Sequence, residues 1–164
     1  MKSYRDILIW VKARPRLTLV LKLADVLAVL GAVCAYLVTL GLCAAEDVWF
    51  SAKLLLVSGV PFVVVSAVRR IINAPRPYEL LCDVYELPPK KRQGCSFPSR
   101  HVFSAFSIGA ALCFVRPMVG IIVIALGLLC AVSRVLLGKH FLRDVVAGAI
   151  IGAVTSVIGM IIMI

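Results

Sequence analysis

The sequence predicts an all-α integral membrane protein, a helical bundle of about five transmembrane helices plus an N-terminal interfacial helix. Hydrophobic residues make up 62% of the 164 residues, and the mean hydropathy is +1.06. They fall in blocks of about 20 residues, the length that crosses the hydrocarbon core of a bilayer, and not in the narrow stripes of amphipathic helices. A soluble domain of this size could not bury so many apolar side chains. The blocks therefore indicate membrane spans.

The N-terminal segment 1–16 differs from the blocks that follow it. Residues 3–14 mix aromatic and aliphatic side chains with several charged ones, which is typical of a short helix lying in the membrane interface. Pro15 is expected to end this helix. No apolar stretch followed by small residues marks a cleaved signal peptide, so the segment is expected to remain in the mature protein.

Five blocks are predicted to span the membrane and to form, with the rest of residues 1–164, a single domain without internal repeats. Their approximate bounds are 17–43, 48–70, 99–115, 117–136 and 144–164. In the first block, Lys22 and Asp25 share a helix face and are expected to pair locally or to snorkel. In the last block, Gly148 and Gly152 stand four residues apart, which allows a close approach of helices in lipid.

The loop 71–98 is the long stretch of the chain that is not apolar, and it holds five of the eight prolines. A loop of this length in a small protein usually serves a function. Cys82 and Cys95 lie in it and are the two cysteines whose surroundings would allow a disulfide, because the other four lie in apolar blocks. No cysteine spacing resembles a zinc site.

The formal net charge of +10 would indicate a nucleic-acid partner in a soluble protein. Here the basic residues lie between apolar blocks and not along one exposed face. We therefore expect no nucleic acid, and expect the lipid bilayer and an anionic, phosphorylated membrane lipid as partners. The sequence carries no prediction of the oligomeric state.

Three short segments hold nearly every residue able to bind phosphate: 69–77, 98–101 and 133–144. Each adjoins the end of a predicted span, and counting the passes places all of these ends on one face of the membrane. The two histidines of the chain, His101 and His140, both fall in these segments. Taken alone, each residue has a structural explanation, since arginines at helix ends are common interfacial anchors. Their convergence indicates a site for an anionic substrate.

The spacing of these residues indicates phosphoryl transfer. His140 and Asp144 are four residues apart, so in a helix the carboxylate could accept a proton from one ring nitrogen while the other faces substrate as a nucleophile. His101 is expected in the first turn of a helix started by Pro98 and Ser99, where serine can cap free amides and the helix N-terminus attracts anions. Forked donors for the phosphoryl oxygens are available from three arginines: Arg69, Arg76 and Arg134.

These residues resemble the type 2 phosphatidic acid phosphatase (PAP2) family. Its three signatures are Lys, six residues and Arg-Pro; then Pro-Ser-Gly-His; then Ser-Arg, five residues, His, three residues and Asp. The corresponding residues here are Arg69 with Arg76-Pro77, Pro98-Ser99-Arg100-His101, and Ser133-Arg134 with His140 and Asp144. The third signature matches in full, and the resemblance covers about residues 65–160.

The resemblance implies a membrane lipid phosphatase that requires no metal and no other cofactor. His140 would attack phosphorus to form a phosphohistidine, Asp144 would orient it, and His101 would protonate the leaving group and then activate water. The phosphoryl oxygens would be bound by Arg69, Arg76, Ser99, the Arg100 amide and Arg134. The lipid would carry a phosphate monoester, as in phosphatidylglycerophosphate or phosphatidate, or a diphosphate, as in polyprenyl diphosphate.

The chain departs from the family pattern in three places. Arg69 replaces the usual lysine, which keeps the charge but changes its reach and geometry. Arg100 replaces glycine, which would clash if the position required positive φ but could extend the site toward a second phosphate. The family is often built on six helices, whereas five spans are predicted here.

The charge distribution predicts the orientation in the membrane. Basic residues dominate the N-terminal segment, while the first connection on the opposite face carries Glu46 and Asp47. The positive-inside rule places the N-terminus in the cytoplasm and, two passes later, also the site and the basic run at residues 90–92. The sequence thus predicts a multi-pass cell-membrane protein with a cytoplasmic site.

Two other classes of function compete with a phosphatase. A non-catalytic membrane scaffold or small transporter would give His140 no chemical role. A vanadate-binding haloperoxidase of the same superfamily is disfavoured, because those enzymes resemble soluble proteins and this chain is mostly apolar.

Overall fold

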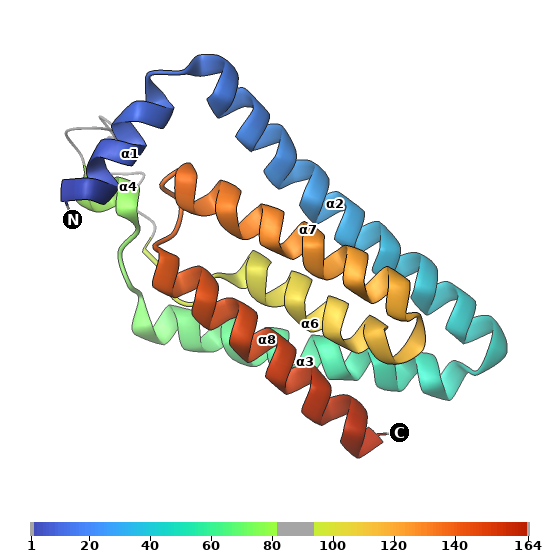
Figure 1. Ribbon diagram of the computed structural model, residues 1–164. Coiled ribbons are helices and arrows are strands. Elements are labelled where there is room, and N and C mark those ends of the chain that lie inside the picture. Colours follow the sequence, from blue (N-terminus) through green and yellow to red (C-terminus); the bar gives the residue numbers. More distant parts are fainter. Residues whose placement is uncertain (1, 82–93, 164) are drawn as a thin grey trace.

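The computed structural model describes residues 2–81 and 94–163 (Figure 1). The described part is helical, with seven helices: α1 (Lys2–Lys12), α2 (Pro15–Glu46), α3 (Val48–Ile72), α4 (Pro77–Leu80), α6 (Arg100–Val115), α7 (Pro117–Leu136) and α8 (Leu142–Met163). The predicted all-α bundle is therefore confirmed.

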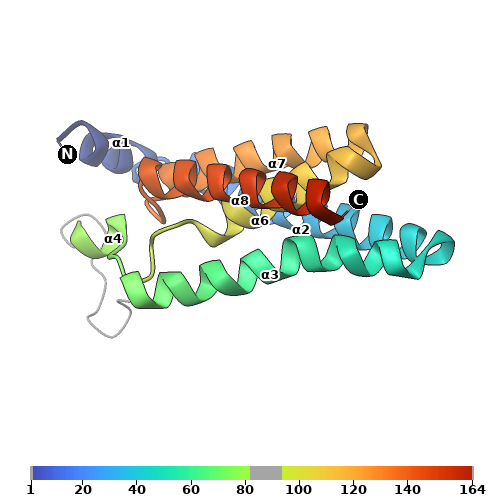
Figure 2. The same ribbon diagram turned by 90° about the horizontal axis from the view of Figure 1, so that it is seen from below.

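Four helices in the described part of the chain are long and apolar enough to cross a membrane, namely α2, α3, α7 and α8. The predicted span 99–115 corresponds to α6, an apolar helix of only 16 residues. Helix α6 lies in the middle of the bundle and packs against α7 and α8 on its two sides (Figures 1 and 2). Its side chains Val102, Phe103 and Leu112 are fully buried, so protein surrounds much of α6.

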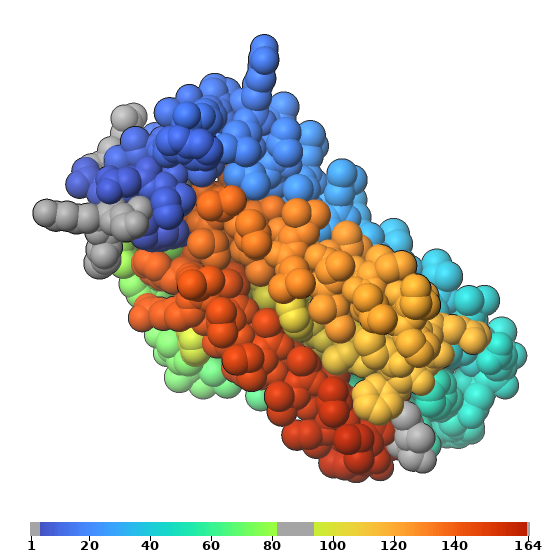
Figure 3. Space-filling model, viewed as in Figure 1, coloured from blue at the N-terminus to red at the C-terminus, as the bar shows by residue number. Residues whose placement is uncertain are grey.

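The outer surface of the bundle is apolar. Large hydrophobic side chains are exposed on every long helix, for example Leu27, Val63, Ile122 and Ile161. Figure 3 shows one such outer face, to which α2, α7 and α8 contribute. An apolar surface of this extent is expected where lipid, and not water, is the solvent. The chain is a multi-pass membrane protein.

Prolines begin several helices, because a proline at the first helical position has no amide that would lack a partner. Pro15 begins α2 and does not simply end the N-terminal helix, which already ends at Lys12. Pro117 likewise begins α7 directly after α6. Asp47 caps α3 by accepting hydrogen bonds from the amides of Trp49 and Phe50, at 2.8 and 3.2 Å.

Helix α1 is amphipathic, as the sequence predicts for residues 3–14. Leu8 and Val11 are buried, while Ile7, Ile9 and Trp10 are about half exposed, at 43, 45 and 53%. The buried face packs against α2 and α7. This short helix thus lies beside the end of the bundle where α7 ends.

Glycines set the distance between α6 and α8. A Cβ atom at Gly148 would lie 2.6 Å from the carbonyl oxygen of Ser99, and one at Gly152 would collide with the carbonyl oxygen of Phe103. The predicted close approach at this glycine pair is confirmed. It brings the N-terminal ends of α6 and α8 together.

Candidate active site

The ends of four helices meet at one end of the bundle, as counting the passes predicts (Figures 1 and 2). The amide of Ser99 donates to the carbonyl of Asp144 at 2.8 Å, which joins the start of α6 to the start of α8. Arg69, near the end of α3, donates from Nη1 to the carbonyl of Pro98 at 2.9 Å. All three signatures therefore come together at this end.

His140 lies in the connection between α7 and α8, and the residue is 1% exposed. Its Nδ1 is 3.7 Å from Oδ2 of Asp144 and 3.4 Å from Oγ of Ser96. The Ser96 hydroxyl also donates to Oδ2 of Asp144. The carboxylate and the hydroxyl together hold Nδ1, which leaves Nε2 as the nitrogen available for chemistry.

The predicted helical spacing of His140 and Asp144 is wrong in its local detail. Helix α8 begins at Leu142, after His140. The pair still forms because the amide of Phe141 donates to Oδ2 of Asp144 at 3.0 Å and folds the connection back onto the first turn of α8. The turn, and not a shared helix face, joins the two residues.

Burial lowers the pKa of His140 below its ordinary value of 6.5, although the hydrogen bond to Asp144 opposes this effect. Arg76 and Arg134 lower it further, because their positive charges disfavour an imidazolium. Together, burial and the two arginines keep the imidazole ring neutral at physiological pH. A neutral imidazole is the form that can act as a nucleophile.

Ser99 occupies the N-cap position of α6 as predicted, but its side chain makes no capping hydrogen bond. The predicted capping role is wrong. Its Oγ is fully buried and has no hydrogen-bond partner among the described residues. The first amides of α6 likewise lack intrahelical acceptors, as at any helix start. This helix start therefore offers donors for an anion.

Arg100 is the first residue of α6, and its exposed guanidinium lies 5.6 Å from the ring of Phe62. In the described part of the chain, Asn73 and Cys95 are the non-glycine residues with positive φ. Arg100 has helical backbone geometry and not a positive φ. The steric clash that a positive φ would cause for an arginine in place of glycine therefore does not arise.

Arg69 and Arg76 contact the loop that leads into α6. Arg69 is 7% exposed, and its Nη2 donates to the carbonyl of Cys95. Arg76 donates from Nε to the carbonyl of Gly94 at 3.0 Å. The two arginines thus fix residues 94–98 and place two positive charges beside the start of α6.

Arg134 makes a contact that the sequence did not predict. Its Nε lies 2.9 Å from Oδ1 of Asp25 in α2, and Nζ of Lys139 lies 2.7 Å from Oδ2 of the same carboxylate. The predicted local partner of Asp25, Lys22, is exposed instead. Of the two predicted alternatives, local pairing is wrong, because two cations from the third signature segment contact the carboxylate where α2 packs on α7. The exposed Lys22 is compatible with the other alternative, snorkelling.

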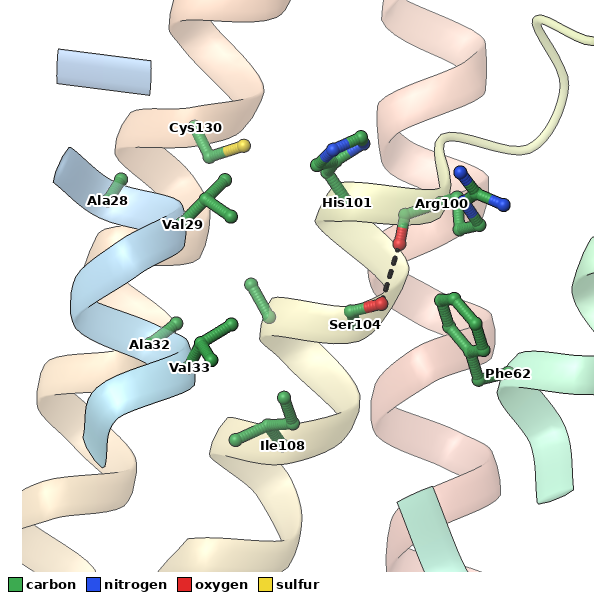
Figure 4. Close-up of a pocket in the computed structure, with 11 residues that line it drawn as sticks. Ala28, Val29, Ala32, Val33, Phe62, Arg100, His101, Ser104, Ile108 and Cys130 are labelled. Carbon is green, nitrogen blue, oxygen red and sulfur yellow. Dashed lines mark hydrogen bonds between the residues drawn. The ribbon is translucent and has the colours of Figure 1, made fainter. Parts of the chain in front are cut away.

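His101 lines a pocket of about 200 Å³ between α2, α3 and α6 (Figure 4). Apart from His101, Arg100 and Ser104, its walls are mostly apolar, with Val29 and Val33 from α2 and Phe62 from α3 among them. A second pocket of about 240 Å³ shares Val33, Phe62, Ser104 and Ile108 with the first. The two pockets adjoin at these residues, and we refer to them together as the groove, which runs from His101 along α2, α3 and α6.

Ser96 and Asp25 are the site residues that sequence reasoning missed. The signal for Ser96 was its position two residues before the Pro98-Ser99 pair, in a loop already expected to matter. The signal for Asp25 was an acidic residue in an apolar span, where an unpaired charge is expensive. Neither residue belongs to a signature.

Some expectations fall outside the described residues. Cys82, the suggested partner of Cys95, lies there, and so does the basic run at residues 90–92. Among the residues that the structure does describe, no group of three or more His, Cys, Asp or Glu side chains could hold a metal ion.

The PAP2 superfamily model matches residues 48–163, which is most of the chain and includes all three signature segments. The chain belongs to the PAP2 superfamily. It is therefore a hydrolase of phosphoric esters, as the members of this family are phosphatases. A search of curated proteins finds no significant match.

Two solved structures of PAP2 proteins share the fold. LpxE from Aquifex aeolicus is 28% identical, with a TM-score of 0.71 over 97% of this chain and 93% of that one. The first transmembrane PAP2 type phosphatidylglycerolphosphate phosphatase from Bacillus subtilis is 22% identical, with a TM-score of 0.73 over 98% of this chain and 84% of that one. The family's membrane bundle is thus present here nearly in full.

Proposed function

We propose that this PAP2 protein is a metal-independent lipid phosphatase that forms a phosphohistidine at His140. The arrangement of His140, Ser96 and Asp144 carries the proposal. Nδ1 is held by two oxygen-bearing side chains, and burial keeps the ring neutral. Nε2 is then the nucleophile, and it lies in a connection next to the donor-rich start of α6.

The reaction proceeds in two displacements at phosphorus. First, Nε2 of His140 attacks phosphorus while the bond to the ester oxygen breaks, and His101 gives a proton to that oxygen. Asp144 stabilises the positive charge that develops on the imidazole. Second, His101 takes a proton from water, the water oxygen attacks phosphorus, and the P–N bond breaks. Inorganic phosphate leaves, and both histidines return to their starting states.

The phosphoryl oxygens are bound by donors from three helices. Ser99 contributes its buried hydroxyl, and Arg100 contributes its amide at the start of α6. The guanidinium groups of Arg69, Arg76 and Arg134 neutralise the charge of the phosphoryl group. Since Arg69 and Arg76 also donate to loop carbonyls, they would connect the loop before α6 to the bound phosphate.

A lipid substrate is supported by the groove that begins at His101 (Figure 4). Its walls of alanine, valine, phenylalanine and isoleucine suit an acyl or prenyl chain, while the polar residues Arg100, His101 and Ser104 also line it. A phosphate ester seated at the site would thus extend its tail between α2 and α3. Soluble phosphate esters would leave this apolar groove empty.

The substrate class is a phosphate monoester or a diphosphate of a membrane lipid. The positive-inside rule favours a cytoplasmic site, where glycerophospholipid monoesters are made, and the Bacillus subtilis neighbour is described as acting on phosphatidylglycerolphosphate. Arg100 stands where it could meet a second phosphate. Phosphatidylglycerophosphate, phosphatidate and a polyprenyl diphosphate are therefore the substrates to compare.

The test is phosphate release by the purified protein from these three lipids, with wild type beside His140→Ala. We expect wild type to release phosphate in the presence of a chelator and His140→Ala to lose at least about 10³-fold in kcat. Rapid quenching with a radiolabelled lipid should trap an acid-labile, alkali-stable phosphoprotein in wild type only. A folded His140→Ala variant with wild-type turnover would favour a non-catalytic role for this residue and contradict the mechanism.

A further inference from the structure

Asp25 is a buried acid on α2 that lies outside the three signatures and outside the region matched by the family model. The residue is 2% exposed, and its carboxylate forms an ion pair with Nε of Arg134 at 2.9 Å and accepts a hydrogen bond from Nζ of Lys139 at 2.7 Å. The thiol of Cys130 lies 3.4 Å from Oδ1 and 3.3 Å from Nε of Arg134. The carboxylate therefore has three partners, all on α7 or the connection that follows it.

Burying the charge of Asp25 within an apolar helix destabilises the protein unless other groups compensate for it. A carboxylate within an apolar span is stabilised only by close, well-oriented cations. Both cations come from the segment that carries the nucleophile, and Lys139 directly precedes His140 in the chain. The carbonyl of Arg134 also accepts from the amides of Lys139 and His140, at 2.9 and 3.3 Å. Asp25 thus ties α2 to the connection that holds His140.

The geometry at Arg134 matters for phosphate binding. Asp25 contacts the guanidinium through Nε, and neither η nitrogen has a hydrogen-bond partner among the described residues. A guanidinium held by Nε presents its Nη atoms in a fixed direction, and these are the donors that bind phosphate as a fork. Two cations against one carboxylate also leave a net positive charge for an anionic substrate.

We infer that Asp25 is a positioning residue that orients Arg134 toward the phosphoryl group bound beside His140. This inference rests on the proposed function. Asp25 does not touch substrate, and it acts through Arg134. Removing its charge would leave Arg134 free to turn its guanidinium away from the position that the phosphoryl oxygens occupy.

The test compares Asp25→Asn with Thr39→Val, a substitution at another buried polar residue of α2 whose hydroxyl bonds only within its own helix. We expect Asp25→Asn to lose roughly 10- to 100-fold in kcat/KM, the size of effect that misplacement of a binding group produces. Inhibition by vanadate, an oxyanion that mimics the phosphoryl group in transfer, should weaken in parallel. Thr39→Val should keep wild-type values of both.

A double-variant cycle separates positioning from mere support of the fold. In an Arg134→Gln background, adding Asp25→Asn should change the residual kcat/KM by less than about twofold, because the residue through which Asp25 acts is already gone. Losses that multiply across the two backgrounds would contradict the inference. So would wild-type activity and vanadate inhibition in Asp25→Asn alone.

A second variant covers the outcome in which Asp25→Asn does not fold. Asp25→Glu keeps the negative charge that the two cations require, but its longer side chain displaces the guanidinium. Thermal unfolding near that of wild type, combined with a lower kcat/KM and weaker vanadate inhibition, would support positioning, whereas unchanged kinetics would overturn it. If these variants contradict the role of Asp25, the proposed phosphohistidine at His140 still stands. Absence of the phosphohistidine in wild type would instead overturn the proposed function itself.

Discussion

His140 is oriented through one ring nitrogen by two neighbours from different segments, Ser96 before α6 and Asp144 at the start of α8. The 3.7 Å separation between Nδ1 and the carboxylate is longer than an ordinary hydrogen bond. The Ser96 hydroxyl bridges this gap, because it lies within reach of both groups. At the scale of the residue, a three-membered arrangement holds the nucleophile.

The lowered pKa of His140 predicts the acid limb of the activity profile. A group whose pKa falls below 6.5 keeps its neutral, nucleophilic form as the pH drops below that value. On the acid side, the kcat/KM of the free enzyme should therefore be lost when the pH falls through the lowered pKa of His140. The measurement is kcat/KM against pH in detergent.

The second pKa of a substrate phosphate monoester is itself about 6. To separate the substrate's titration from that of the enzyme, the profile should be recorded with two monoesters whose second phosphate pKa values differ by about one unit. We expect an acid limb that is common to both substrates and lies below pH 6.5. A common limb at or above that pH would show that His140 is not the buried, neutral group described here.

Sequence spacing predicted which residues gather but not how they are held. The signature pattern located His101, His140 and Asp144 at one end of the bundle, because signature spacing and pass counting depend only on the chain order. Ser96 and Asp25 could not be predicted in the same way. Their contacts depend on how the loop before α6 folds and how α2 packs on α7, and neither is encoded in local spacing.

At the scale of the element, α6 is short and surrounded by protein, and its contact with α8 depends on glycine. Hydrophobic blocks predicted the long helices to within a few residues. The same blocks could not distinguish a span that faces lipid from one enclosed by other helices, since both are apolar. Helix α6 is enclosed because α8 packs closely against its backbone at Gly148 and Gly152.

Gly148→Ala should therefore impair both stability and activity. The added methyl group would lie 2.6 Å from the carbonyl of Ser99, and backbone atoms there cannot yield without shifting the start of α6. Overpacking of this kind costs typically about 1–3 kcal/mol of unfolding free energy. The shift would also displace Ser99 relative to Asp144, so kcat/KM should fall by roughly tenfold or more.

The control for this variant is Gly41→Ala in α2, where an added Cβ has no atom within 4 Å. It changes the same residue type in a helix, and it should leave both the thermal midpoint and kcat/KM near those of wild type. If Gly148→Ala behaved like Gly41→Ala, close packing of α6 on α8 would not be what fixes the site.

At the scale of the whole molecule, the groove and the site face different environments. The end of the bundle with the signature residues is rich in arginine, whereas the groove that starts at His101 runs along apolar helices. A lipid with its phosphate at the membrane surface and its tail in the bilayer would match both parts without leaving the membrane. This match follows from the bundle as a unit and could not be predicted from any single signature.

The orientation of the bundle is the remaining property of the whole molecule, and it decides which pool of lipid reaches His140. Glu46 ends α2 on the face away from the site, and Arg70 lies near the end of α3 on the face of the site. Both residues are exposed. In a background without the native cysteines, Glu46→Cys and Arg70→Cys therefore report the two faces. If the site is cytoplasmic, a membrane-impermeant maleimide should label Glu46→Cys in intact cells and Arg70→Cys only after permeabilisation. The reverse pattern would place the site outside and favour polyprenyl diphosphate as the substrate, with Arg100 near its second phosphate.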